Sequence, residues 1–167
     1  EGVDYNLWDQ IGATWLLTGQ VEGLGEGLVL VLSLHDVVYS EVREQGRFPL
    51  PDPAADNFRM AVHRVSDEIV EWVFGEPGMA ASRIAFSMVG GSGAQELYLI
   101  DSDGENLRRI TSDNFINMSP AWHPGGGKLA YINFTEGEPS KIREMDFLSG
   151  QIKTLDPGRE GQQITPA

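Results

Sequence analysis

The chain has 167 residues, with 25 acidic and 12 basic side chains, a formal net charge of -13 and no cysteine. A chain of this length makes about one ordinary domain and can bury a core, and 41% hydrophobic residues exceed what a disordered acidic tail carries. The acidic excess argues against nucleic acid and against an anionic membrane surface as partners, because both are bound through Lys and Arg. The lack of cysteine excludes a disulfide framework, a thiolate metal site and a cysteine nucleophile.

The chain changes pattern near residues 75–83. Before this point helix signals and long strand signals alternate, and after it short strands are separated by Gly, Asp, Asn and Ser. This change predicts a first domain over 1–75, a linker over 76–82 and a second domain over 83–167.

The first domain opens with a short helix and a hairpin. Asp4 as the N-cap and Gly12 as the stop frame the helix. Apolar runs over 13–21 and 28–37 have the length of strands, and the glycine-rich segment between them predicts an antiparallel hairpin. A third, more polar strand over 38–43 is expected nearer the edge of the sheet.

The clearest helix signal covers 52–74. Asp52 can cap this helix and Pro53 suits its first position, while Gly75 ends it. Apolar residues at steps of three and four form one stripe that faces a core: Phe58, Val62, Val65, Ile69 and Trp72 or Val73. The first domain is therefore expected to be an incomplete α/β layer, a mixed sheet with helices on at least one face.

The second domain repeats itself. The segment from Arg83 to Phe86 matches the segment from Lys128 to Tyr131, a shift of 45 residues. The same shift carries three further sites onto similar residues: Ile100-Asp101 onto Met145-Asp146, Leu107 onto Ile152, and Ile110 onto Leu155. A period of about 40 to 45 residues with several short strands in each unit is the signature of a β-propeller blade.

Each repeat is expected to hold short antiparallel strands, the first over 84–89, 96–101 and 107–111. The second repeat has an extra leading strand over 118–122, and the first repeat has no counterpart ahead of Arg83. The sequence therefore predicts an all-β part made of two incomplete propeller blades, two of six in a whole ring, and the start of a third. We expect the carboxy terminus of the intact protein to supply the missing leading strand and close the ring.

Two sets of motifs resemble a known family. The run Ser119-Pro-Ala-Trp122-His-Pro124-Gly-Gly126-Gly-Lys128-Leu-Ala-Tyr131 is similar to the WD40-like repeat Ser-Pro-x-Trp-Ser-Pro-Asp-Gly-x-x-Leu-Ala-Tyr, with His123 and Gly125 as departures. The segments 13–21, 34–37 and 59–69 are similar, in order and spacing, to the amino-terminal domain of the TolB family of periplasmic propeller proteins. The linker over 76–82 departs from the family's usual join.

The positions that carry the resemblance are expected to be structural. They are Gly19, Asp36, Arg59, Ala61, His63, Asp67, Gly75, Pro120, Trp122, Pro124, Gly126 and Tyr131. Trp122 is expected to pack between blades.

The resemblance implies a non-enzymatic scaffold in the periplasm, without a cofactor or a small-molecule substrate. Members of the family bind the peptidoglycan-associated lipoprotein Pal through the propeller and engage the inner-membrane protein TolA through the extreme amino terminus. They maintain outer-membrane integrity and support division. By this resemblance the chain is a fragment that lacks the TolA-binding segment and most of the Pal-binding face, so no partner contact is assigned to its residues. Its open propeller edges are expected to make it self-associate.

Two other functions remain open on the sequence. Propellers of prolyl-oligopeptidase-like or tricorn-like peptidases use similar repeats, and there the propeller gates substrate to a separate catalytic domain. A family paralogue with another client is the weaker possibility. A signal peptide and a total length near 400 residues would favour the scaffold, whereas a downstream hydrolase domain would favour the peptidase.

Three segments are similar to ligand loops but favour turns. The segment 23–27 lacks the helix that a phosphate loop must enter, and the segment 90–94 is one residue short of a serine-hydrolase elbow and lies between strands. The segment 101–106 resembles the start of a calcium loop, but it lacks the third ligand and the distal Glu. His63 and Asp67 lie one helical turn apart, which favours a structural pair, and the spacing of the three His residues suggests no shared metal.

Overall fold

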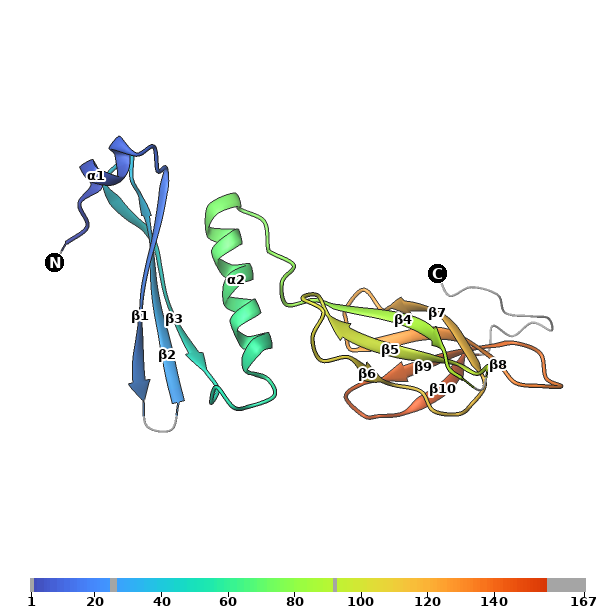
Figure 1. Cartoon of the computed structure of the whole chain (residues 1–167). Coiled ribbons are helices and arrows are strands. Elements are labelled where there is room, and N and C mark those ends of the chain that lie inside the picture. The colour runs from blue at the N-terminus through green and yellow to red at the C-terminus, as the bar shows by residue number, and fades with distance from the viewer. Residues whose placement is uncertain (1, 25–26, 92, 156–167) are drawn as a thin grey trace. The chain divides into compact units, whose positions relative to one another are not determined.

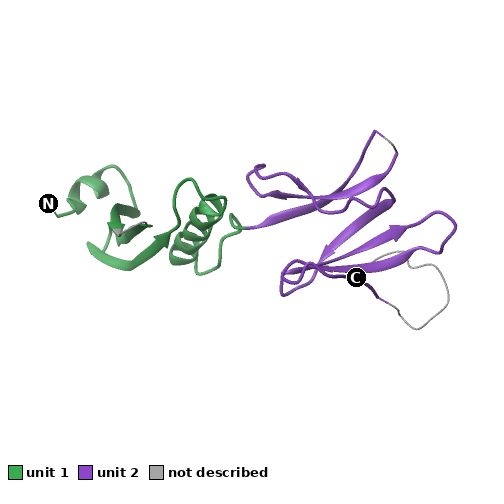
Figure 2. Ribbon diagram, turned by 90° about the horizontal axis from the view of Figure 1, so that it is seen from below, with its two compact units in different colours: residues 1–81 green, residues 82–167 purple. Residues whose placement is uncertain are grey.

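The computed structural model describes residues 2–24, 27–91 and 93–155, and the chain divides into two compact units, residues 1–81 and 82–167 (Figures 1 and 2). Neither of the two described helices combines the length and the apolar character that a membrane-spanning helix needs.

The first unit is a three-stranded sheet with a long helix beside it (Figure 1). Its elements are α1 (Tyr5–Gln10), β1 (Trp15–Leu24), β2 (Gly27–Asp36), β3 (Glu41–Leu50) and α2 (Phe58–Phe74). The strand order is β1-β2-β3, and both pairings are antiparallel. Where the sequence predicted a mixed sheet, the described strands are thus antiparallel throughout, because short connections join each strand to the next.

The amino-terminal helix and the hairpin follow the sequence signals. The side chain of Asp4 accepts a hydrogen bond from the backbone N–H of Leu7 at 3.2 Å, and Gly12 has the left-handed φ of 80° that the chain needs after the helix. The apolar runs of β1 and β2 pair over their whole lengths, from Trp15 opposite Asp36 to Leu24 opposite Gly27. The predicted helix cap and hairpin are both confirmed.

The third strand lies later in the chain than the sequence predicted. Residues 37–40 form a turn, in which the Asp36 carboxylate accepts a hydrogen bond from the Tyr39 N–H at 3.0 Å and Ser40 has a φ of 58°. Strand β3 then runs over Glu41–Leu50, whereas the prediction was 38–43. The polar residues along most of β3 give no apolar run, so the sequence did not mark its length.

The long helix begins six residues later than the predicted start at Asp52. The Asp52 side chain accepts a hydrogen bond from the Ala54 N–H at 2.7 Å, so Asp52 and Pro53 begin a turn, and the helix N-cap is Asn57. A capping residue followed by proline also predicts a turn. The sequence therefore did not distinguish the start of a turn at Asp52 from the start of a helix. The end is as predicted, with Gly75 in the left-handed conformation at φ 75°.

The core of the first unit lies between α2 and one face of the sheet. Its buried members are Leu32, Leu50 and Val65. Residues of the predicted helical stripe pack against them, together with side chains of β2 and β3: Leu28, Leu30, Phe48, Phe58, Ala61, Val62, Ile69 and Trp72. The stripe is confirmed as a core-facing surface.

The second unit has the repeated strands that the shift of 45 predicts. The elements are β4 (Arg83–Val89), β5 (Gln95–Asp101), β6 (Arg108–Arg109), β7 (Ile116–Trp122), β8 (Lys128–Phe134), β9 (Lys141–Asp146) and β10 (Ile152–Leu155). We call β4 to β6 the first blade and β7 to β10 the second blade. Strand β8 begins 45 residues after β4, and β9 ends 45 residues after β5, so the two blades repeat in structure as in sequence.

The blades are joined through β5 and β7, which pair in parallel at Gln95 and Ile116. The order from one end is β10-β9-β8-β7-β5-β4, with β6 also paired to β5. Among the described residues, β4 pairs with β5 alone, so no leading strand of the first blade comes from this part of the chain. The predicted start of a third blade falls on 156–167, outside the described residues.

Candidate interaction surface at the junction between the blades

A buried carboxylate organises the junction between the two blades. Glu96 is 3% exposed at the start of β5. Its oxygens accept hydrogen bonds from the Arg109 guanidinium at 2.7 Å, the Thr111 hydroxyl at 2.5 Å and the backbone N–H of Asn114 at 2.9 Å. A buried charge is tolerated only when it is paired and hydrogen-bonded, and this one is both.

The second blade joins the same network through two buried amides. Asn117 on β7 donates to Glu96 at 3.2 Å and to Asp113 at 2.7 Å. Asn133 on β8 donates to the Asn117 side-chain oxygen at 2.8 Å and to Asp113 at 3.3 Å. We call Glu96, Thr111, Asp113, Asn117 and Asn133 the junction network. Because the polar atoms of the network hydrogen-bond one another, the network fixes how β5, β7 and β8 meet. It leaves few polar atoms free to bind a ligand.

Beside the junction network lies an apolar layer that holds an unpartnered hydroxyl. Leu97 from the first blade packs with Leu129, Tyr131 and Met145 from the second. Tyr131 is fully buried, and its hydroxyl has no hydrogen-bond partner among the residues that the structure describes. Burial raises the pKa of the Tyr131 phenol, although the nearby Arg143 guanidinium opposes the shift.

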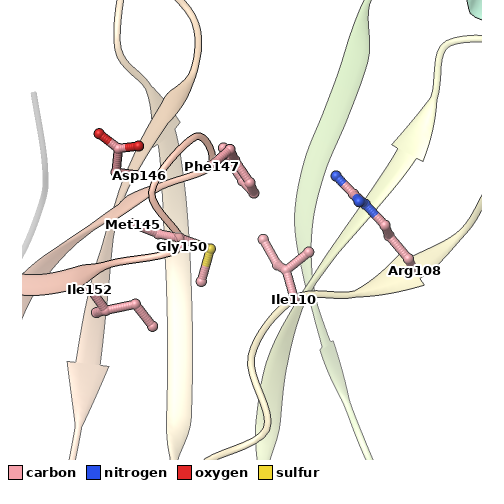
Figure 3. A pocket seen from close by; sticks show the side chains of 7 residues that line it. All are labelled: Arg108, Ile110, Met145, Asp146, Phe147, Gly150 and Ile152. Atoms are coloured by element: carbon pink, nitrogen blue, oxygen red, sulfur yellow. The ribbon is translucent and has the colours of Figure 1, made fainter.

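A pocket of about 280 Å³ opens at the outer end of the junction (Figure 3). The first blade contributes Arg108 and Ile110, and the second contributes the end of β9, the following turn and the start of β10: Met145, Asp146, Phe147, Gly150 and Ile152. Ile110, Met145 and Phe147 also belong to the apolar layer, so the floor of the pocket is continuous with the core.

An ion pair recurs at the same place in both blades. Arg83 contacts Asp101 at 3.1 Å, and 45 residues later Lys128 contacts Asp146 at 3.6 Å. Each pair ties the first residue of one strand to the last residue of its neighbour. Both cations are about half exposed, so the pairs add little stability, but they mark the repeat as a structural unit.

In the first unit, Asp67 on α2 holds the segment that follows the helix. Its carboxylate accepts hydrogen bonds from the backbone N–H groups of Ala80 at 2.6 Å and Ala81 at 2.9 Å. Gly78 lies so close that a Cβ there would stand 2.7 Å from the Asp67 Cα. Residues 78–81 are thereby fastened to the helix.

No family model matches the chain, but comparison with individual proteins is decisive. The chain is 32% identical over 164 residues to the Tol-Pal system protein TolB of Methylococcus capsulatus, which covers 95% of this chain and 38% of the relative. It is 37% identical over 137 residues to TolB of Desulfosudis oleivorans, covering 82% of this chain and 30% of the relative. The crystal structure of TolB from Acinetobacter baumannii superposes with a TM-score of 0.77 at 27% identity, over 92% of this chain and 38% of that one.

The chain is similar to TolB. The similarity extends over both units in one continuous order, and it confirms the resemblance predicted from the motifs. It also confirms the fold class, an α/β unit followed by incomplete propeller blades. The chain spans 38% and 30% of the lengths of these two TolB relatives.

The motif positions that were predicted to be structural in the first unit lie mostly where packing or a turn needs them. A Cβ on Gly19 would stand 2.7 Å from the side chain of Leu32 on the neighbouring strand. Asp36 caps the β2–β3 turn, and Ala61 packs in the core. The two remaining positions on α2, Arg59 and His63, are exposed and half-buried respectively.

The motif positions in the second blade form a bulge and a turn. The pairing of β7 with β8 shifts between Met118 and Ala121, and Pro120 lies in this bulge, where no ladder donor is required. Gly126 has a φ of 66° and donates its N–H to the His123 carbonyl at 2.8 Å, which closes the turn after Pro124.

The packing of Trp122 between blades stays a prediction. The Trp122 ring contacts Phe147 of its own blade at a centroid distance of 5.5 Å, and the residue is 38% exposed. Trp122 is the last residue of β7, opposite Leu129.

The segment that resembled a calcium loop is a turn, as the sequence favoured. Asp101 accepts hydrogen bonds from the Arg83 guanidinium at 3.1 Å and from the Asn106 amide at 2.6 Å, while Gly104 has a φ of 87°. Strands follow the segments 23–27 and 90–94, and neither leads into a helix. Within the described residues no cluster of three or more His, Asp or Glu side chains could hold a metal.

Sequence reasoning did not find the junction network. Its members come from positions 96 to 133, and no local spacing links them. The shift of 45 residues was one available signal. It aligns Glu96 of the first repeat with Lys141 of the second, so Glu96 departs from the repeat.

Proposed function

We propose that this chain is part of a non-enzymatic interaction scaffold of the Tol-Pal system. In the whole protein, the propeller binds a Pal-like lipoprotein and an amino-terminal segment engages a TolA-like inner-membrane protein. The scaffold would act in the periplasm, without a cofactor, to maintain outer-membrane integrity and support cell division. The observation that carries the proposal is the similarity of both units, in one order, to TolB.

The first unit favours a scaffold over a peptidase. A peptidase propeller would explain the repeat in the second unit, but it would leave unexplained the similarity of residues 1–81 to the same relatives.

A capture experiment in solution tests the proposal. The full-length protein that carries this chain is titrated with the purified periplasmic domain of the Pal-like lipoprotein from the same source, and formation of the complex is measured by calorimetry. We expect a complex of one to one stoichiometry that a lipoprotein domain of similar size and charge does not form. A TolA-like periplasmic domain is tested in a parallel arm.

Two results would contradict the proposal. The first is the absence of a complex with the Pal-like domain at concentrations up to about 100 µM, well above the range of specific interfaces. The second is the release of a chromophore from a prolyl peptide substrate by the same preparation, which would favour the peptidase alternative.

A further inference from the structure

The pocket at the junction has an apolar floor and one apolar wall, and Arg108 and Asp146 are its charged lining residues. Ile110, Met145 and Phe147 form the floor, and Ile152 forms one wall (Figure 3). Leu148, in the turn that borders the pocket, is 98% exposed. Apolar surface that is rimmed by polar groups and open to solvent is typical of a place where another molecule binds.

The two charged residues of the pocket differ in what they offer to a ligand. The Asp146 carboxylate accepts hydrogen bonds from the N–H groups of Leu148 and Ser149, each at 2.9 Å, and it lies 3.6 Å from the Lys128 ammonium. Hydrogen bonding to the Ser149 N–H is the main cause that lowers the pKa of Asp146. This carboxylate is therefore ionised, and it already accepts hydrogen bonds from the turn that follows it.

Arg108 is the charged residue of the pocket that is available to bind a ligand. Within the part of the chain that the structure describes, its guanidinium has no ion-pair partner, although the protein carries a net charge of -13. Figure 3 shows this guanidinium directed across the pocket, whereas the Asp146 carboxylate is directed away from it. A guanidinium beside an apolar floor selects a carboxylate that is attached to an apolar group.

The size of the pocket limits the ligand. Small-molecule sites usually enclose about 300 to 1,000 Å³, and this pocket of about 280 Å³ is at the small end of that range. It has room for one or two side chains, which is the size of an anchor from a partner protein.

We propose that this pocket docks a protein segment in which an apolar side chain is followed or preceded by an acidic residue. The apolar side chain enters between Ile110, Phe147 and Ile152, and the carboxylate binds Arg108. The inference rests on the proposed function, because the partner of a scaffold is a protein. It adds which kind of protein segment this part of the scaffold recognises.

Peptide titration of the whole chain tests the inference. Three capped probes, acetyl-Glu-Leu-Gly-amide, acetyl-Lys-Leu-Gly-amide and acetyl-Glu-Ala-Gly-amide, are titrated into 15N-labelled protein and followed by amide chemical shifts. We expect the first probe to shift the signals of Arg108, Ile110 and Ile152 at millimolar concentration. Each of the other two probes should bind about tenfold more weakly, because it lacks one of the two interactions.

Matched variants assign the binding to the pocket. Arg108→Glu is expected to weaken the first probe about tenfold or more, while Arg64→Glu, the same change on an exposed position of α2, leaves it unchanged. Ile152→Ala is expected to weaken it severalfold, with Val21→Ala on exposed β1 as its control.

Equal binding of the Glu and Lys probes would overturn the inference, as would equal effects of the two arginine variants or the absence of pocket shifts with the first probe. The titration is independent of the capture of a Pal-like domain. A failed titration with successful capture refutes only the pocket, and the reverse outcome refutes only the identity of the scaffold's partners.

Discussion

At the scale of single residues, Tyr131 shows how the second unit uses its buried polar groups. The junction network satisfies its carboxylates and amides, whereas the fully buried Tyr131 hydroxyl has no hydrogen-bond partner in the described part of the chain. A buried hydroxyl without a hydrogen bond costs free energy that a phenyl ring at the same place does not. The equivalent residue of the first blade, 45 positions earlier, is Phe86, which indicates that the blade tolerates an apolar ring here.

We therefore expect Tyr131→Phe to leave the free energy of unfolding at pH 7 unchanged or to increase it by up to about 1 kcal/mol. Burial raises the pKa of Tyr131 in the folded protein above the value of 10.0 that it has when exposed. The stabilising contribution of the protonated phenol is complete below about pH 10 and is lost as the pH rises through the folded-state pKa. The variant should thus lose less stability than the parent between about pH 9 and pH 11.

Urea unfolding curves at pH 7, 9, 10 and 11 measure this difference. Tyr39→Phe is the control, because Tyr39 is 75% exposed in the β2–β3 turn. Parallel stability curves for the parent and Tyr131→Phe across this pH range would contradict the argument, as would a loss of more than about 2 kcal/mol at pH 7.

At the scale of elements, the connection after α2 is part of the first unit's structure. The Asp67 carboxylate binds two consecutive backbone N–H groups, and the missing side chain of Gly78 lets the chain pass over the helix. The Asp67 carboxylate acts like a helix cap, although it does not lie at a helix end. It accepts hydrogen bonds from backbone N–H groups that have no partner in a strand ladder.

We expect Asp67→Ala to release this segment and to lower the stability of the first unit by about 1 to 3 kcal/mol, because two backbone donors lose their acceptor. Amide hydrogen exchange at Ala80 and Ala81 is the direct readout and should accelerate at least tenfold. Glu71→Ala, which removes an exposed carboxylate from the same helix, is expected to leave both amides unchanged. Unaltered exchange in Asp67→Ala would show that the hydrogen bonds do not hold the segment.

Elements with a strong local pattern were predictable from the sequence, and contacts between distant residues were not. Period-two and helical patterns marked β2 and the body of α2, and the shift of 45 marked the blades, because burial of one face imposes these periods on the sequence. The predicted start of α2 was wrong because the same residues signal a turn and a helix cap. The predicted extent of β3 was wrong because a polar strand has no apolar run. The pocket and the junction network join segments up to 44 residues apart through tertiary contacts that no local pattern records.

At the scale of the whole molecule, the first blade leaves its far surface open. Ile84, Phe86 and Met88 share one face of β4 by the period of two, opposite the face that carries Ala85 toward the blade junction. Ile100 and Tyr98 stand opposite Ile84 and Phe86 on β5 and continue this face. Ile84 and Met88 are 52% and 41% exposed, so the described chain has an apolar sheet face with little cover.

We expect the chain by itself to self-associate through this face and the free edge of β4. The net charge of -13 opposes association, so the weight-average mass from light scattering should rise with concentration and rise more at 0.5 M than at 0.05 M salt. The double variant Ile84→Lys with Met88→Lys should shift the midpoint of association to at least about tenfold higher concentration, because two ammonium groups would have to be desolvated in the contact. The double variant Leu7→Lys with Ile11→Lys makes the same change in net charge on exposed positions around α1, so it separates the effect of the face from that of charge. A monomer at every concentration and salt level would contradict the expectation, and equal weakening by the two double variants would assign the association to charge instead of to the first blade.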